Sequence, residues 1–370
     1  MEFRRKLLHV QSLVVADLPP EMIVNILSRL SVKSLCRFRC VSKSWLALIS
    51  NSRFVKMHLT QTQRESLFID AENCSFYSID LESITYDVDK VDTVKLDFDI
   101  GGRKWNPRKP WISYSNGLLC IVHEKCFWLY NPSTRERKQV KFQGDRKFWL
   151  RFGFSYVDST DDYKFVRLHN LEKIVEIYSL RKNSWKSIEH DLSNVGFGIR
   201  QWVGFPLNGA IHWEFYYYDK IEEPSVIVAF DLFEESFKTL TLPNIIVGSR
   251  FVGIFGGCLC MVSRWDEINE FWVMEEYGVK ASWSKILTVN SILYPQPLCY
   301  LKNSNIMMFS TSEGLAIYNP EYRKFKKIEV DDIQKFWVVY PYVESLVSPN
   351  YENHFTNEGN HIIPPILSLF

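Results

Sequence analysis

The sequence lacks the short motifs that mark the commonest catalytic and cofactor sites. It contains no glycine-rich phosphate loop of the GxxxxGK(S/T) or GxGxxG type, no HExxH zinc motif and no GxSxG nucleophile turn. Its eight histidines are scattered along the chain rather than gathered at metal-ligand spacing. We therefore expect no catalytic residues, no cofactor and no metal ion.

Paired cysteines are also missing. None of the eight cysteines forms a CxxC pair or lies beside histidines at a spacing that suits zinc. Several fall within apolar runs, such as Leu118–Ile121 and Cys258–Met261, where a free thiol behaves as a small core side chain. This predicts reduced, buried cysteines and an intracellular location in the cytoplasm, the nucleus or both.

Long apolar runs and a charge of one sign are absent as well. No run approaches the length needed to span a bilayer, and polar residues such as His9 and Asp17 interrupt the N-terminal apolar stretch. We interpret residues 1–17 as a short lead-in rather than a signal peptide. With 44 basic and 43 acidic residues, the chain has no general attraction to nucleic acid or to a membrane surface, and we expect neither as a partner.

Apolar and aromatic residues, by contrast, are plentiful. They make up 46% and 15% of the 370 residues, which is enough for a sizeable core in more than one domain or in one large β architecture. The polar run Thr60–Arg64 separates two parts of different periodicity. We place domain boundaries at residues 18–60 and 65–348, with a C-terminal tail at 349–370.

Residues 18–60 have helical periodicity. Leu-Pro-Pro-Glu is a typical helix start, and Met22, Ile26 and Leu30 recur on one apolar face. Further short helices are expected after Ser31 and from Ser42. Three helices of this length cannot bury so much apolar surface alone, so we expect a partner to cover part of it. The segment carries seven basic residues and one acidic residue.

Beyond residue 64 the pattern is that of an all-β domain. Strand-like runs alternate with polar turns, and a unit recurs in which a strand-ending residue is followed, usually seven positions later, by another large side chain. The anchors fall at residues 79, 130, 178, 230, about 274 and 318, so the period is roughly 44–52 residues. This is the length of a four-stranded propeller blade, and it predicts a kelch-like β-propeller of about six blades. A pair of less regular β-sandwiches is the alternative.

The helical segment strongly resembles an F-box. The matching residues are Leu18, Pro19, Ile26, Leu27, Leu30, Val32, Lys33, Leu35, Val41, Ser42, Lys43 and Trp45. The resemblance implies binding to a Skp1-like adaptor, and through it to a cullin and a RING protein, with complementary charge aiding encounter with an acidic Skp1. The Skp1-binding residues it implies are Leu18, Pro19, Ile26, Leu30, Leu35, Val41 and Trp45. An ordinary three-helix bundle, such as a helix-turn-helix, is the alternative.

The β region carries a second resemblance. Five motifs occur in the order found in the F-box-associated domain of plant F-box proteins: Asn131–Arg135, Gly153–Val166, Asn208–Trp213, Trp272–Gly278 and Tyr342–Val347. This large family includes S-locus F-box proteins and regulators of immune receptors. In it the β domain selects the protein to be ubiquitinated. The target-binding residues are not identified by the sequence, although Phe215–Tyr218 fits either a loop hot spot or a plain strand.

Together these observations predict a non-catalytic substrate-recognition component of an SCF-type ubiquitin ligase, mainly β, with a small three-helix F-box before the propeller. Two other classes remain open. The first is a Skp1-binding or general interaction scaffold outside a ligase. The second is an enzyme on a kelch-type propeller, such as a copper oxidase, which would need histidine ligands and a tyrosine–cysteine pair that converge at the axis.

Overall fold

The protein is described by a computed structural model with side chains. The described residues are 19–61, 64–72, 75–98, 111–123, 125–143, 150–169, 173–190, 198–199, 202–216, 226–243, 249–290, 295–331, 333 and 335–350. No helix in these ranges is long and apolar enough to cross a membrane. From residue 351 onward the predicted tail lies outside them.

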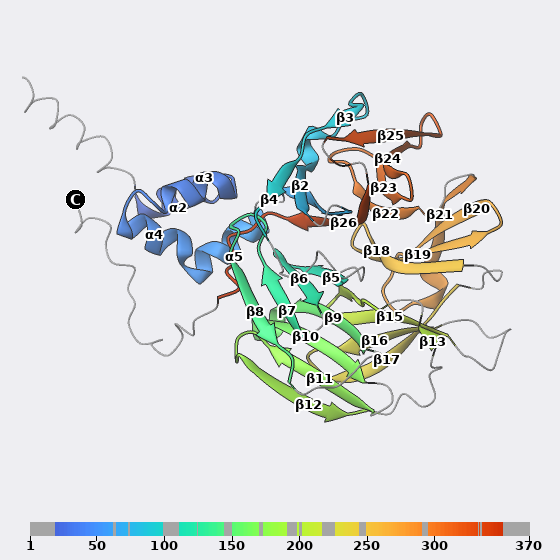
Figure 1. Cartoon of the computed structure of the whole chain (residues 1–370), viewed down its shortest axis with the longest axis horizontal. Coiled ribbons are helices and arrows are strands. Elements are labelled where there is room, and N and C mark those ends of the chain that lie inside the picture. Colours follow the sequence, from blue (N-terminus) through green and yellow to red (C-terminus); the bar gives the residue numbers. More distant parts are fainter. Residues whose placement is uncertain are drawn as a thin grey trace, which may run out of the picture.

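The N-terminal part of the described chain is helical (Figure 1). Its helices are α2 (Pro20–Leu27), α3 (Val32–Phe38), α4 (Lys43–Ser50) and α5 (Ser52–Gln61). Hydroxyl groups cap two of them, and both helices begin where the sequence predicts: Ser31 Oγ accepts from the Ser34 amide at 3.4 Å, and Ser42 Oγ accepts from the Trp45 amide at 3.2 Å. The fourth helix was not predicted, because Phe54 and His58 are the only fully buried side chains in its largely polar sequence.

The rest of the described chain forms six sheets, which we number as blades 1 to 6. Blade 1 contains β5 (Trp111–Ser115), β6 (Leu118–His123), β7 (Cys126–Tyr130) and β8 (Arg137–Lys141). Blade 2 contains β9 (Leu150–Val157), β10 (Asp162–His169), β11 (Ile174–Ser179) and β12 (Ser184–Glu189). Blade 3 contains β13 (Gly198–Ile199), β14 (Phe205–Leu207), β15 (Ala210–Tyr216), β16 (Val226–Asp231) and β17 (Ser236–Thr241).

The remaining blades follow the same antiparallel plan. Blade 4 contains β18 (Ser249–Phe255), β19 (Cys258–Trp265), β20 (Ile268–Met274) and β21 (Trp283–Asn290). Blade 5 contains β22 (Gln296–Tyr300), β23 (Met307–Thr311), β24 (Gly314–Asn319) and β25 (Lys324–Val330), with β3 (Lys90–Val91) added in parallel. Blade 6 contains β26 (Phe336–Val343), β1 (Glu65–Ala71), β2 (Phe76–Asp80) and β4 (Val94–Leu96).

The last strand closes the ring. β26 pairs with β1 along its length, from Glu65 opposite Val343 to Ala71 opposite Phe336, so the two ends of the β domain are held in one blade. The first strands β5, β9, β14, β18, β22 and β26 each contact the next around the axis. The predicted six-bladed propeller is therefore confirmed.

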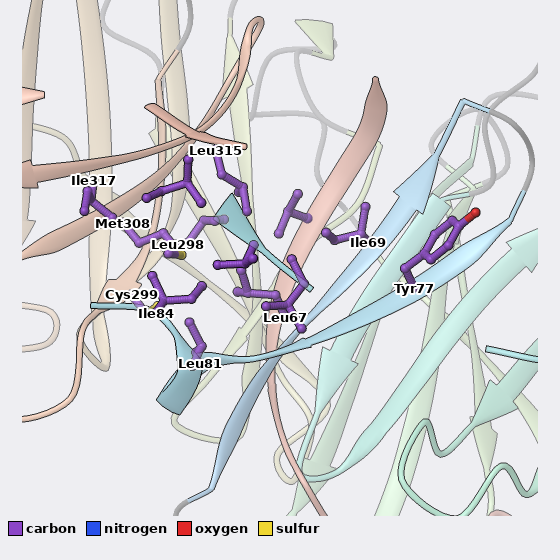
Figure 2. Close-up of a cluster of buried hydrophobic side chains, with 14 of the residues drawn as sticks. Leu67, Ile69, Tyr77, Leu81, Ile84, Leu298, Cys299, Met308, Leu315 and Ile317 are labelled. Atoms are coloured by element: carbon purple, nitrogen blue, oxygen red, sulfur yellow. The ribbon is translucent and has the colours of Figure 1, made fainter. Parts of the chain in front are cut away.

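Apolar cores lie between neighbouring blades rather than at one centre. Figure 2 shows the core between blades 5 and 6, where Leu67 and Ile69 of β1 face Leu298, Met308 and Leu315 of blade 5. Similar cores join each of the other neighbouring pairs of blades. Because each blade buries both faces in this way, its strands need apolar residues on both sides and polar residues only at the hairpin tips.

The repeat detected in the sequence corresponds to one position in every blade. All six anchors lie on the third strand: Ile79, Tyr130, Tyr178, Phe230, Met274 and Tyr318. In blades 1, 2, 3 and 5 the residue seven positions later faces the anchor across the hairpin, as in Tyr178–Trp185 and Phe230–Phe237, whose ring centroids are 5.3 and 4.8 Å apart. In blade 4 the longer turn brings Trp283 opposite Met274. A cross-strand pair of large side chains at the outer hairpin of blades 1 to 5 thus generates most of the observed period.

Candidate protein-interaction sites

The helical unit displays an apolar face that no other part of the described chain covers. Met22 and Ile26 of α2 are 51% and 50% exposed, Val41 before α4 is 66% exposed, and Leu46 of α4 is 47% exposed. Four exposed large apolar side chains on one small helical unit favour an interaction surface. We call these four residues the apolar face.

The residues predicted to bind Skp1 differ in how deeply they are buried. Ile26 and Val41 belong to the apolar face, and Pro19 beside it is also exposed. Leu30 and Trp45 are half-buried and pack against the core beneath.

Of the remaining two predicted residues, the structure describes only Leu35. Leu35 is fully buried in the core of the helical unit, so it supports the apolar face from beneath. Leu18 lies outside the described residues. Met22 and Leu46 were not among the predicted binding residues, although both stand on the apolar side of their helices in the sequence. Helical periodicity alone does not separate the side of a helix that faces its own core from the side that faces a partner.

The basic side chains of the helical unit divide into two groups. Arg39 and Lys56 form ion pairs with the propeller, to Glu136 at 3.6 Å and to Asp161 at 2.7 Å. The other five are exposed: Arg29, Lys33, Arg37, Lys43 and Arg53. Burial of Asp161 opposes its ionisation, but hydrogen bonds from Lys56 and Tyr156 outweigh this effect and lower its pKa.

A C-terminal strap, residues 344–350, joins the helical unit to the propeller. Leu346 is 1% exposed and packs into the helical core with Leu27, Val32 and Phe54. The strap follows β26 directly, so the helical unit is held against the strand that closes the ring.

Asn131 holds this strap in place. Its Nδ2 lies 3.0 Å from Ser345 O, 3.1 Å from Ser345 Oγ and 2.7 Å from Val347 O, and the side chain is fully buried. Its Oδ1 accepts from the amides of Ser133 and Thr134 in the predicted Asn-Pro turn. The sequence indicated the turn but gave no signal for the strap, because the two segments are more than 200 residues apart.

His58 fastens α5 beneath the same unit. Its ring is fully buried, and Nε2 lies 2.8 Å from the carbonyl oxygen of Leu30. That carbonyl requires a proton on Nε2, while Nδ1 has no hydrogen-bond partner in the described chain. Burial lowers the pKa of His58 below 6.5, so the neutral imidazole is the stable form.

The two ends of the propeller differ. We call the end with the hairpin turns Asn116–Gly117, Asn208–Gly209 and Gly256–Gly257 the F-box end, because the strap and both ion pairs to the helical unit lie there. We call the other end, where β5, β9 and β18 begin, the distal end. Figure 1 shows the helices beside one side of the ring.

A cavity of about 760 Å³ lies along the axis. First strands of five blades and the loop Tyr300–Asn305 line it, and its lining also includes Asn116 and Gly257 at the F-box end. The hydroxyl of Tyr114 in its wall accepts from the amides of Gly117 and Val343, and burial raises the pKa of this side chain to about 12. Tyr114 is therefore a fixed structural group that joins blades 1 and 6.

The aromatic run at the end of β15 is part of the core where the structure describes it. Phe215 is buried between blades 2 and 3, with Trp213 beside it in the same core. This fits the strand interpretation for the beginning of the run. Tyr217 and Tyr218 lie outside the described residues.

Comparison with known proteins agrees with this geometry. Residues 66–349 match the model of the F-box associated beta propeller domain, and residues 15–57 match the F-box domain. The chain is 28% identical to the F-box/kelch-repeat protein At3g23880 of Arabidopsis thaliana, over 90% of this chain and 96% of that protein. It is 27% identical to the F-box protein CPR1 of the same plant, over 90% and 89% of the two chains. The predicted resemblance is confirmed: the chain belongs to the F-box proteins that carry an F-box-associated β-propeller domain.

Proposed function

We propose that this protein is the substrate receptor of an SCF-type ubiquitin ligase. The apolar face of the F-box binds a Skp1-like adaptor, which connects it to a cullin and a RING protein, and the propeller binds a target protein. The observation that carries the proposal is the apolar face itself: four large aliphatic side chains, each about half exposed or more, on a unit of F-box sequence. Exposing them to water is unfavourable, so a partner that covers them gains free energy.

In this proposal the chain performs no bond chemistry. It raises the effective concentration of target lysines at the charged conjugating enzyme by holding the target in a fixed place. The strap supports this role, because a propeller that moved freely on the F-box would spread the target over a larger volume. The seven cysteines in the described residues are all free thiols, which suits a reducing location in the cytoplasm or nucleus.

The binding residues in this proposal are Pro19, Ile26 and Val41 at the surface, with Leu30, Leu35 and Trp45 beneath them and Leu18 adjoining in sequence. The five exposed basic residues of the unit hasten encounter with an acidic adaptor.

The experiment is assembly of the complex from purified parts. We expect the chain to retain a cullin N-terminal domain only when a plant Skp1 homologue is present. The four-protein assembly with the RING protein should then modify lysines of the bound chain in the presence of ubiquitin and its activating and conjugating enzymes. A chain that binds Skp1 but excludes the cullin would be a scaffold outside a ligase, and this result would overturn the proposal.

A further inference from the structure

An aromatic patch lies at the distal end of the propeller, on blades 1 to 3. Trp111, the first residue of β5, is 37% exposed. Its ring stacks on Trp202 with centroids 5.8 Å apart and packs against Phe152 at the same distance. The carbonyl of Trp202 accepts from the Phe152 amide at 3.0 Å, which fixes the second tryptophan to blade 2. Rigid aromatic rings of this kind are the commonest anchors of protein interfaces.

A small cavity of about 50 Å³ opens beneath this patch, between blades 1 and 2. Trp111, His123, Phe142, Phe165 and Arg167 are among the residues that line it. It exceeds the roughly 10–15 Å³ that a single water needs, and its lining is mainly aromatic and aliphatic. The end of one aliphatic side chain fits this space.

The wall of the cavity is held rigid by buried charges. Arg167 Nε donates to Glu176 Oε2 at 2.5 Å, and His169 Nε2 lies 2.6 Å from the same oxygen. Burial opposes ionisation of Glu176, but His169 and Arg167 outweigh it and lower the pKa of this carboxyl group. The guanidinium group lies 4.6 Å from the centre of the Phe142 ring. The cavity therefore exists before any partner arrives, which reduces the entropic cost of binding.

Two exposed lysines lie near the patch. Lys125 and Lys141 are exposed at the distal end of blade 1. His123, Cys126 and Lys141 pair across three adjacent strands, so Lys141 lies roughly 10 Å from His123 at the rim of the cavity.

Blade 4 carries acidic residues at the same end. Trp265 there is 57% exposed, but Asp266 and Glu267 follow it directly. An aromatic side chain is thus available on both sides of the distal end, and the positive charge with the preformed cavity distinguishes blades 1 and 2.

From this arrangement we infer that the target docks on the distal patch through an extended acidic segment with one aliphatic anchor side chain. The anchor enters the cavity beside Trp111, and the carboxylates face Lys125 and Lys141. This inference rests on the proposed function and gives the target its chemical class. It also places the target at the end of the propeller opposite the F-box, where a bound adaptor leaves it accessible.

The test uses a phage-displayed library of random 12-residue peptides, selected on the full chain bound to a plant Skp1 homologue. We expect the selected peptides to be enriched in Asp and Glu around a Leu, Ile, Val or Met. The affinity of the strongest peptide is then measured by fluorescence anisotropy. Trp111→Ala should weaken it at least tenfold, as expected for an interface hot spot. The double charge reversal Lys125→Glu, Lys141→Glu should also weaken it at least tenfold at low salt, and it leaves the core intact.

Matched controls carry the same chemical changes elsewhere. Trp265→Ala removes an exposed tryptophan from the same end, and Lys324→Glu, Lys327→Glu reverses two exposed lysines on blade 5. Both should change the affinity less than twofold. Absence of enriched peptides, selection of neutral or basic peptides, or displacement of the peptide by a single-stranded 20-mer DNA oligonucleotide would overturn the inference. Failure of the chain to bind Skp1 would instead contradict the proposed function, and the selection would then be made on the chain alone.

Discussion

The contact between Asn131 and the strap provides a sharp test of how the F-box is held. Asn131→Ala removes the NH2 group that faces Ser345 and Val347. This group has two hydrogens, so its three contacts count as about two hydrogen bonds. At about 1 kcal/mol each, their loss should destabilise the docked strap by about 2 kcal/mol, and more if a buried carbonyl stays unpaired.

The chain supplies a matched control for this change. Asn319 precedes a proline in blade 5 as Asn131 does in blade 1, and its Oδ1 likewise accepts from two amides of the following turn, those of Glu321 and Tyr322. No strap contacts it among the described residues. Asn319→Ala therefore measures the stability lost with the turn hydrogen bonds alone. The difference between the two variants measures the stability that the contacts to the strap contribute.

Hydrogen exchange of the amides in α2 to α5 measures this difference. A loss of 2 kcal/mol corresponds to roughly thirtyfold faster exchange through opening of the F-box in Asn131→Ala than in Asn319→Ala. Equal exchange rates in the two variants would show that Asn131 acts only in its turn, and the account of a strap that couples F-box and propeller would be refuted.

Three further predictions concern the same region. Leu346→Ala should lower the free energy of unfolding of the F-box by about 2–5 kcal/mol, measured by denaturant titration, because it opens a cavity in that core. Gly117→Ala should destabilise the protein by about 1–3 kcal/mol more than Gly209→Ala, measured by thermal unfolding. Both glycines have a positive φ, so the backbone strain is common to the two variants, but only an alanine at position 117 would place its Cβ 2.2 Å from Ser345 Oγ. The lowered pKa of His58 means that its contribution to stability is complete above about pH 6.5 and is lost as the pH falls below it, because the unfolded chain takes up the proton first. F-box stability measured between pH 7.5 and 5 should decline, and a constant stability would contradict the neutral buried imidazole.

Much of the fold was predictable because its causes are local. The change from helical to strand-like periodicity, the caps at Ser31 and Ser42 and the recurring outer hairpin are each set by residues close in the sequence. The hairpin repeat gave the blade number because five of the six blades place a pair of large side chains at the same position, as Tyr178 and Trp185 illustrate.

The sites were less predictable because they depend on long-range packing. Leu35 and Ile26 are equally apolar in the sequence, but only the packed unit shows that the first is fully buried and the second half exposed. Asn131 carried a clear turn signal, whereas its second role depends on a strap that arrives from the other end of the chain. The cavity beside Trp111 likewise exists only where two blades meet.

The most direct test of the central claim is the affinity of the intact chain for a plant Skp1 homologue, measured by calorimetry. Ile26 and Val41 are each at least half exposed in the free chain, and the adaptor would bury this exposed part on binding. Ile26→Ala together with Val41→Ala should therefore reduce the binding free energy by about 2–3 kcal/mol in total. We predict that this variant binds roughly 30- to 150-fold more weakly, while Phe233→Ala with Tyr322→Ala, at exposed propeller loops, binds as the intact chain does. Equal affinity of all three proteins, or no binding by the folded intact chain, would contradict the account.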